Sequence, residues 1–351
     1  MKVRVQTYPG TLLEHQGDKY HYFGGTSYLG IQLEPQFTAI ALEMIKRYGT
    51  NYGASRRSNI QLEIYEQAET YLAGWIGSEA TLTMSSGYLA GQLIAQHFKS
   101  AEHRLFYAPN SHSALYTSNT RPYTTYTTLN IALREHLDKK ESAVPVVFLD
   151  SIDFSGCNYP DFDILRTLPL DSCILVVDDS HGIGVVGENG AGVFRTLKSL
   201  PCRELLLCAS LGKAAGIQAG VIAGERLRIE KLKASDFFNG ASPAAPFYLA
   251  QFMEAQEIYK LKRKKLQKNI SLFLDLTRDL KILNSMPHYP VFGYSDHNVT
   301  EGLRKRNILV TDFRYPTEDS YATNRIVLTA AHTEEDINVL AKALNSFVQM
   351  P

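Results

Sequence analysis

Hydrophobic residues in the N-terminal part of the chain recur at the spacing of α-helices. Two segments place their apolar residues three and four positions apart, so that they share one helix face. Pro35 opens the first segment, and Gly49 and Gly77 follow the two segments, as is typical of helix starts and ends. The pattern predicts two amphipathic helices, with faces formed by Phe37, Ile40, Ala41, Met44 and Ile45 and by Tyr65, Ala68, Leu72, Trp75 and Ile76.

The middle of the chain contains short runs in which nearly every residue is apolar. They cover residues 144–149, 173–177 and 205–209. A strand covered on both faces is apolar throughout, whereas a strand with one exposed face alternates. The segments between the runs are long enough for the crossover connections that parallel strands require. The pattern therefore predicts an α/β fold with a mostly parallel central sheet flanked by helices.

A further helical pattern begins at about Pro246 and turns strongly basic at residues 260–265. We interpret it as one long helix leading to a smaller C-terminal lobe at about residues 260–351. The basic stretch is interpreted as a solvent-exposed helix face, which is the usual place for such a charge run.

Composition narrows the class of partner. The chain has 351 residues, 44% of them hydrophobic, which is enough for a sizeable core. Lys+Arg and Asp+Glu each total 36, giving a formal net charge of +0, so no long-range field favours a nucleic acid or a membrane surface. The sequence shows no signal-peptide pattern and no apolar run of about 18 residues. These features predict a soluble, cytoplasmic protein that acts on small molecules.

The cysteines give no sign of a metal site or a disulfide. They have neither CxxC spacing nor a histidine at the spacing of zinc ligands. Two of them lie inside apolar runs, as small buried residues do. We expect reduced thiols, as in a cytosolic protein, and no bound metal. The four are Cys157, Cys173, Cys202 and Cys208.

Polar residues with catalytic chemistry follow each of the three apolar runs. Asp150 follows the first run, the string DDSHGIGVVG at residues 178–187 follows the second, and SLGKAAG at residues 210–216 follows the third. In open α/β sheets, ligands bind beyond the carboxyl ends of the strands. We therefore expect carboxylates, a histidine, a hydroxyl and a lysine to meet at one sheet edge.

These residues alone leave other kinds of site open. Residues 182–187 fit GxGxxG, but residues 188–192 favour a turn instead of the helix that a dinucleotide site requires. Ser180 or Ser210 with His181 and Asp178 would suit a hydrolase, although the chain contains no GxSxG elbow. Asp178, Asp179 and His181 would suit a metal, but no second cluster completes the ligand shell.

The motifs and their order resemble those of the α-oxoamine synthases, which are fold-type I acyltransferases dependent on pyridoxal 5′-phosphate (PLP). Residues 176–192 resemble the family segment D-[ED]-[AS]-H-[SG]-x-G-x-x-G-x-x-G-x-G, and residues 210–216 resemble its lysine loop [ST]-x-[SG]-K-x-x-G. Shorter matches cover nearly the whole chain, at residues 27–30, 86–88, 111–113 and 325–332.

The resemblance implies an aspartate-aminotransferase-like fold in three parts. Residues 1–40 would form an N-terminal segment packed near the small domain. Residues 41–245 would form the large PLP-binding domain. Residues 246–351 would supply a connecting helix and a smaller α+β C-terminal domain.

The resemblance also implies which residues are catalytic. Lys213 would carry PLP as a Schiff base. Asp178 would face the pyridine nitrogen, where a carboxylate raises the proton affinity of that nitrogen. His181 would hydrogen-bond the phenolic oxygen, and His112 would stack on the ring.

Further residues are implied in binding. Arg325 would hold the carboxylate of the amino-acid substrate through its planar two-point fork, and Ser180 is a second candidate for substrate contact. Ser242 lies in a segment that resembles the one reaching the phosphate in the partner subunit of the family's homodimers. The remaining residues implied around the phosphate are Ser86, Gly87, Tyr88 and Ser210.

The implied reaction joins a small amino acid to an acyl thioester, with loss of carbon dioxide. The thioester would be that of CoA or of an acyl carrier protein, and the active sites would lie at a homodimer interface. Some segments depart from the family: Thr26 and Ser27 replace Asn-Asp, Ala241 replaces a threonine, and residues 51–56 replace a glycine-rich loop with a bulkier one. Two alternatives therefore remain, a PLP enzyme of this fold that does not use CoA, such as an aldolase or transaminase, and a nucleotide-binding protein without PLP.

Overall fold

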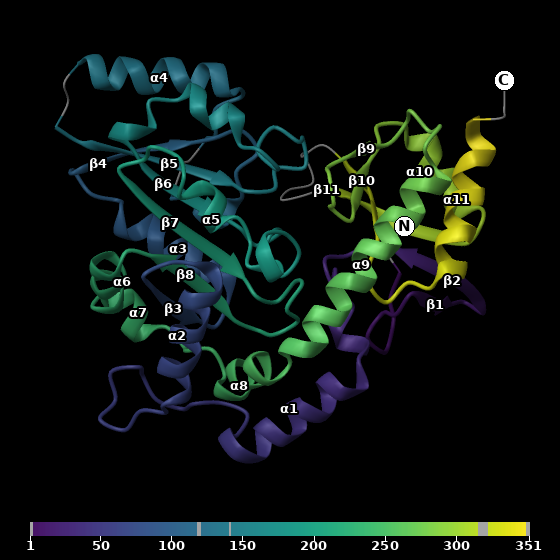
Figure 1. Ribbon diagram of the computed structural model, residues 1–351, viewed down its shortest axis with the longest axis horizontal. Helices are drawn as coiled ribbons and strands as arrows, with labels where there is room; N and C mark the ends of the chain where they lie inside the picture. The colour runs from purple at the N-terminus through teal and green to yellow at the C-terminus, as the bar shows by residue number, and fades with distance from the viewer. Residues whose placement is uncertain (1–2, 118–120, 140–141, 315–321, 349–351) are drawn as a thin grey trace. The chain divides into compact units, whose positions relative to one another are not determined.

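A computed structural model describes residues 3–117, 121–139, 142–314 and 322–348 (Figure 1). The chain divides into two compact units. The central unit is Pro35–Gln256, and the terminal unit combines residues 1–34 with residues 257–351. The limits predicted at residues 40 and 245 fall inside helix α1 (Pro35–Tyr48) and directly before helix α8 (Pro246–Glu254), and both helices belong to the central unit.

The central unit is built on a six-stranded sheet in the order β3-β8-β7-β6-β5-β4. Neighbouring strands from β4 to β7 run parallel, while β8 is antiparallel to both β7 and β3. The apolar runs form β5, β6 and β7, as predicted, and the mostly parallel α/β fold is confirmed. The strands are β3 (Ala80–Met84), β4 (His103–Tyr107), β5 (Val144–Asp150), β6 (Ile174–Asp178), β7 (Glu204–Ser210) and β8 (Gly220–Gly224).

The two predicted amphipathic helices are also present. The first is α1, which buries Phe37 and Met44, and the second is α2 (Ile64–Ile76). Gly77 ends α2 at φ +92°, in the left-handed region that favours glycine. The other helices of the unit are α3 (Gly87–His97), α4 (Tyr126–Asp138), α5 (Phe194–Leu197), α6 (Arg226–Lys233) and α7 (Asp236–Gly240).

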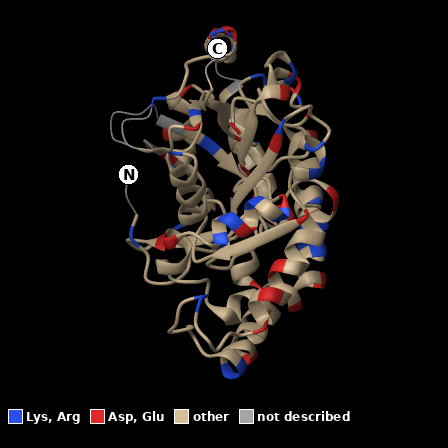
Figure 2. Ribbon diagram, turned by 90° about the vertical axis from the view of Figure 1, so that its left-hand side faces the viewer, with Lys and Arg blue, Asp and Glu red and all other residues tan. Residues whose placement is uncertain are grey.

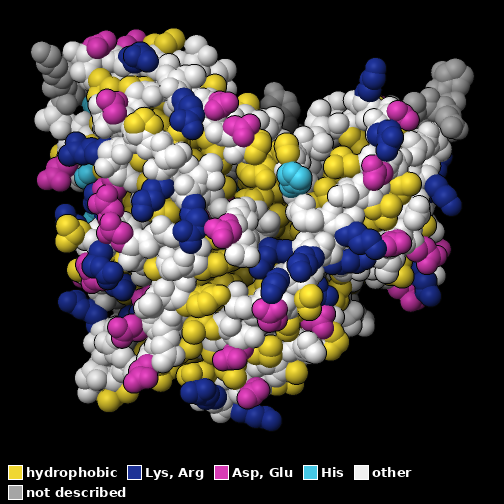
Figure 3. Space-filling model, in the orientation of Figure 1, with side chains coloured by type: hydrophobic (Ala, Val, Ile, Leu, Met, Phe, Trp, Pro, Cys, Tyr) yellow, Lys and Arg dark blue, Asp and Glu magenta, His cyan; other side chains and the backbone are white. Residues whose placement is uncertain are grey.

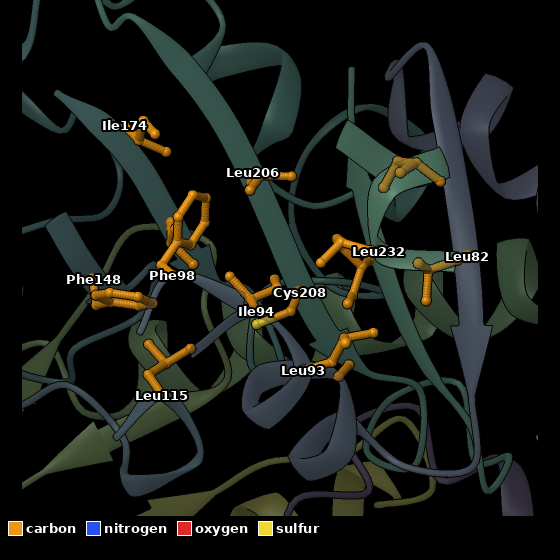
Figure 4. Packing of buried hydrophobic residues seen from close by; sticks show 14 of the residues in the cluster. Leu82, Leu93, Ile94, Phe98, Leu115, Phe148, Ile174, Leu206, Cys208 and Leu232 are labelled. Atoms are coloured by element: carbon orange, nitrogen blue, oxygen red, sulfur yellow. The ribbon is translucent and has the colours of Figure 1, made fainter. Parts of the chain in front are cut away.

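Helices α3 and α6 cover one face of the central sheet (Figure 4). Leu93, Ile94 and Phe98 of the α3 segment pack on Phe148, Ile174, Leu206 and Cys208 of the strands, and Leu232 of α6 lies beside Leu82. These side chains are buried. Since burial of one such side chain contributes about 1.5–3 kcal/mol, the cluster holds α3 firmly against the sheet.

The terminal unit has its own six-stranded sheet, in the order β1-β2-β11-β12-β10-β9. Its N-terminal strands therefore pair with C-terminal ones, β2 running parallel to β11. The strands are β1 (Leu12–His15), β2 (Asp18–Phe23), β9 (Asn284–Ser285), β10 (Val291–Gly293), β11 (Ile308–Arg314) and β12 (Ala322–Val327). The helices are α9 (Gln256–Leu276), α10 (His297–Arg304) and α11 (Glu334–Val348).

The prediction of one long helix from Pro246 is wrong. Ala255 leaves the helical conformation, at φ −89° and ψ 13°, and separates α8 from α9. Both segments have apolar residues at helical spacing, so the pattern did not mark the break. The basic stretch lies on α9, where Lys260 and Lys264 are exposed, and Figure 3 shows basic side chains gathered over this helix.

Residues of both charge signs are spread along the ribbon in Figure 2, in keeping with the neutral net charge. Within the described ranges, no helix combines the length and the apolar character needed to cross a membrane.

Candidate active site

The carboxyl ends of β5, β6 and β7 bring the predicted polar residues together, as expected from the parallel strands. Asp150 and Asp178 are direct neighbours across the β5–β6 ladder, and Ser210 ends β7. Asp178 is almost fully buried, and its Oδ1 accepts a 2.9 Å hydrogen bond from the Ser180 amide. No described residue donates to Oδ2. This oxygen is therefore available for a cationic N–H donor.

Lys213 lies in the turn after β7 and meets His181, which follows β6. The distance from Lys213 Nζ to His181 Nε2 is 3.1 Å. The Phe154 ring also packs against the His181 ring, with the ring centroids 4.8 Å apart and the ring planes at 78°. The structure thus brings the predicted lysine and histidine into direct contact.

His112 is held at the same sheet edge by two backbone hydrogen bonds. Its amide donates to Asp150 Oδ1 at 2.9 Å, and its Nδ1 accepts from the Ala114 amide at 3.1 Å. An accepting Nδ1 assigns the proton of the neutral ring to Nε2. Burial lowers the pKa of His112, with Asp178 opposing this shift and Lys213 adding to it. The geometry therefore favours a neutral imidazole that donates through Nε2.

Asp150 lies at this sheet edge as expected, but no role was predicted for its carboxylate. Burial raises its pKa well above the usual range, and the neighbouring Asp178 carboxylate adds to the rise. Both causes disfavour the charged form of Asp150. The sequence contained part of the signal, because Asp150 and Asp178 directly follow the first two apolar runs. It did not contain the strand register that makes the two aspartates neighbours.

The start of α3 packs against the end of β7. A Cβ at Gly87 would lie 2.5 Å from Ser210 Cβ, so only glycine allows this approach. Ser86 caps the helix, its Oγ accepting from the Leu89 amide at 3.2 Å. The amides of Gly87 and Tyr88 lie in the first helical turn, where backbone N–H groups have no partner within the helix. The helix N-terminus beside the Ser210 hydroxyl favours an anion such as a phosphate.

Ser180 lies inside this edge and is buried. Its Oγ accepts a 2.8 Å hydrogen bond from the Ser210 amide, which ties the end of β6 to the end of β7. This contact positions the two strand ends, and a direct contact of Ser180 with substrate stays a prediction.

Asp179, considered above only as a metal ligand, anchors the glycine-rich loop that follows it. Its two carboxylate oxygens accept from Ser151 Oγ at 2.6 Å and from the Val193 amide at 3.0 Å. A Cβ at Gly182 or Gly192 would lie about 2 Å from these oxygens. The loop turns around the carboxylate instead of opening a helix, so the glycines lack the context of a dinucleotide site.

Burial raises the pKa of Asp179 to about 7. Between the usual aspartate pKa of about 4 and this value, the folded state binds a proton that the unfolded state has lost, so rising pH destabilises the fold. We expect Asp179→Asn to remove up to about 1.4 kcal/mol per pH unit of this dependence. Urea unfolding of variant and parent from pH 4 to 8 measures the difference. The exposed Asp279→Asn is the control, and equal slopes in all three proteins would contradict the assignment.

Two of the predicted site residues, Ser242 and Arg325, are not among the residues that meet at the ends of β5, β6 and β7. Ser242 lies exposed between α7 and α8, and no hydrogen bond links it to the other site residues in the described part of the chain. Arg325 belongs to the terminal unit, on β12 beside Thr311 and Gly293. Burial lowers its pKa, against the favourable influence of Tyr28 and Tyr289.

The sequence model of the family Aminotransferase class I and II matches residues 27–344. The chain belongs to this family. The match spans both units, so the family assignment covers the whole of the site described above and Arg325 as well.

Relatives within the family carry the name of one α-oxoamine synthase. The chain is 28% identical over 356 residues to 8-amino-7-oxononanoate synthase of Cronobacter sakazakii, covering 96% of this chain and 91% of the relative. It is 29% identical over 361 residues to the enzyme of that name from Halorhodospira halophila, covering 97% and 89%. These names confirm the resemblance found in the motifs.

Solved structures with the same fold include two members of this group. SPT (serine palmitoyltransferase) with a PLP internal aldimine aligns with a TM-score of 0.80 at 17% identity, covering 98% of this chain and 92% of that one. The 8-amino-7-oxononanoate synthase from Francisella tularensis aligns with a TM-score of 0.71 at 20% identity, covering 94% and 98%. The fold-type I architecture is thereby confirmed.

Proposed function

We propose that the chain is a PLP-dependent α-oxoamine synthase that condenses a small amino acid with an acyl thioester. One observation carries the proposal: Lys213 Nζ meets His181 Nε2 at 3.1 Å, at the sheet edge where one oxygen of Asp178 has no donor among the residues that the structure describes. Family membership and the relatives' names support it.

The residues of the central unit fit PLP. Asp178 would accept a hydrogen bond from the protonated pyridine nitrogen, which keeps the proton on that nitrogen, and the α3 N-terminus with Ser210 would hold the phosphate. Because Gly87 has no side chain, the start of α3 can lie close to Ser210. When bound, PLP supplies an electron sink for the Cα of the amino acid.

The chain's own residues would then divide the work of binding and proton transfer. His112 would be one of the residues that hold the cofactor, in an orientation fixed by the hydrogen bond from the Ala114 amide to its Nδ1. Lys213 would accept the Cα proton, with His181 holding its amine. Arg325 would hold the substrate carboxylate before carbon dioxide leaves, and its burial would strengthen this contact. We expect a homodimer in the cytoplasm, with Ser242 reaching the phosphate of the partner's site.

Among α-oxoamine synthases, we propose 8-amino-7-oxononanoate synthase, which joins L-alanine to a pimeloyl thioester in biotin synthesis. The segment at residues 328–332 supports this choice, as do the relatives. CoA release from pimeloyl-CoA should be fastest with L-alanine, exceeding glycine by roughly tenfold or more in kcat/KM, since one methyl group allows that discrimination. A preference for glycine with a shorter acyl-CoA would favour 2-amino-3-ketobutyrate CoA ligase.

A second candidate is an enzyme of this fold that does not use CoA, such as an aldolase or transaminase. The altered loop at residues 51–56 favours this candidate. Its Tyr52 hydroxyl donates a hydrogen bond to the Ile60 carbonyl and its Arg56 donates to Glu69, so the loop has less conformational freedom than a glycine-rich loop would have. The same assay separates the two. A spectral response to amino acids without CoA release from any acyl-CoA, tested from acetyl to palmitoyl, would support this candidate.

A further inference from the structure

The loop after β5 is fixed at both ends and presents one aromatic side chain between them. At its start, Ser151 donates to Asp179. At its end, the buried Asn158 donates to the Asp150 carbonyl at 2.6 Å and accepts from Tyr126. Between these anchors, the Asp153 carboxylate accepts from Ser155 Oγ and, at 3.1 Å, from the Gly156 amide, which tightens the turn.

Phe154, at the tip of this turn, adopts a conformation that phenylalanine disfavours. Its φ is +56°, in the left-handed region where glycine and asparagine are common and bulky residues are rare. A glycine at this position would relieve the strain. Such strain persists where the surrounding contacts impose it, and it is frequent beside functional groups.

The constrained ring lies against the histidine of the site. The Phe154 and His181 rings meet edge to face, and His181 Nε2 in turn meets the amine of Lys213. The strained residue Phe154 is therefore connected to the Lys213 amine through the His181 side chain, which contacts both.

We propose that Phe154 is a positioning residue that fixes the rotation of the His181 imidazole toward Lys213. The role rests on the proposed function, because its purpose is to present His181 Nε2 where the cofactor joins the lysine. The ring, and not the bulk of the side chain, does this, since an edge-to-face contact sets the angle between two rings.

The test uses the full-length chain and separates the ring from the backbone strain. Phe154→Leu keeps the left-handed strain and loses the ring, Phe154→Tyr keeps both, and Phe154→Gly loses both. His288→Gly, at an exposed left-handed residue of the terminal unit, is the control for strain relief alone. The imidazole NMR signals of His181, assigned by their loss in His181→Gln, report the ring contact without cofactor.

The His181 signals should carry a ring-current shift that is lost in the leucine and glycine variants and retained in the tyrosine variant. The glycine variant should melt no lower than the parent, as should His288→Gly, which leaves the His181 signals unchanged. PLP affinity, followed by its visible band, should weaken up to about tenfold in Phe154→Leu and not in Phe154→Tyr.

Unchanged His181 signals in Phe154→Leu would overturn the proposal. So would equal PLP affinity in the leucine variant and the parent. If the parent itself does not bind PLP, the proposed function fails, and the NMR comparison still decides whether Phe154 orients His181.

Discussion

Lys213→Ala is expected to abolish the visible absorbance of the PLP-loaded protein and to reduce turnover by on the order of 10³-fold or more. The reason is chemical: covalent attachment of an aldehyde needs an amine, and the Lys213 amine is the one that meets His181 at the edge holding Asp178. Absorbance spectra of the purified protein with added PLP and CoA release from an acyl-CoA measure the two effects.

Two further variants show whether the effect comes from loss of the Lys213 amine, and not from loss of its positive charge or from removal of any lysine. Lys213→Arg keeps a cation beside His181, so the fold should survive, but a guanidinium does not replace the nucleophilic amine, and the band should be lost. Lys198→Ala removes an exposed lysine and should leave both readouts at the parent level. A Lys213→Ala protein that kept the parent's band and turnover would refute the assignment of the lysine.

Much of this site follows from the sequence, because strands buried on both faces produce uninterrupted apolar runs. Where a parallel strand ends is then visible as the first polar residue, and Asp178 and Ser210 were placed in this way. The ends of such strands meet at one edge whatever the details of the helices. Contact between His181 and Lys213 could therefore be predicted from two strand ends that are far apart in the sequence.

The rest depends on contacts that no local pattern contains. The bond from the His112 amide to Asp150 depends on the β4–β5 register, and the pairing of Asp150 with Asp178 depends on the β5–β6 register. A one-residue slip would change either of them. The anchoring by Asp179 depends on a loop that folds back onto the carboxylate of its own strand end. The break at Ala255 likewise separates two segments that both have helical periodicity.

The largest effect on stability is expected at Glu69, a buried carboxylate of α2 that joins several segments of the central unit. Its oxygens accept from Arg56 at 2.9 and 3.2 Å and from the amide and hydroxyl of Thr83 at 2.8 and 3.0 Å. Lys233 of α6 lies 3.2 Å away. The Arg56 guanidinium also lies over the Tyr65 ring, 4.3 Å from its centroid. Glu69 thereby fastens the loop at residues 51–56, whose composition departs from that of the α-oxoamine synthases.

Glu69→Gln should lower the free energy of unfolding by about 3 kcal/mol, because it removes the carboxylate paired with Arg56, whose side chain is only 11% exposed, and one of the two carboxylates paired with Lys233. The amide oxygen of glutamine still accepts from Thr83, so the loss isolates the ionic contacts. Glu257→Gln breaks an exposed pair with Lys260, at 3.4 Å, and should cost about 0.5 kcal/mol or less. Urea unfolding at pH 7 compares the two. Equal losses would mean that Glu69 contributes no more than a surface charge, and that packing instead holds the 51–56 loop in place.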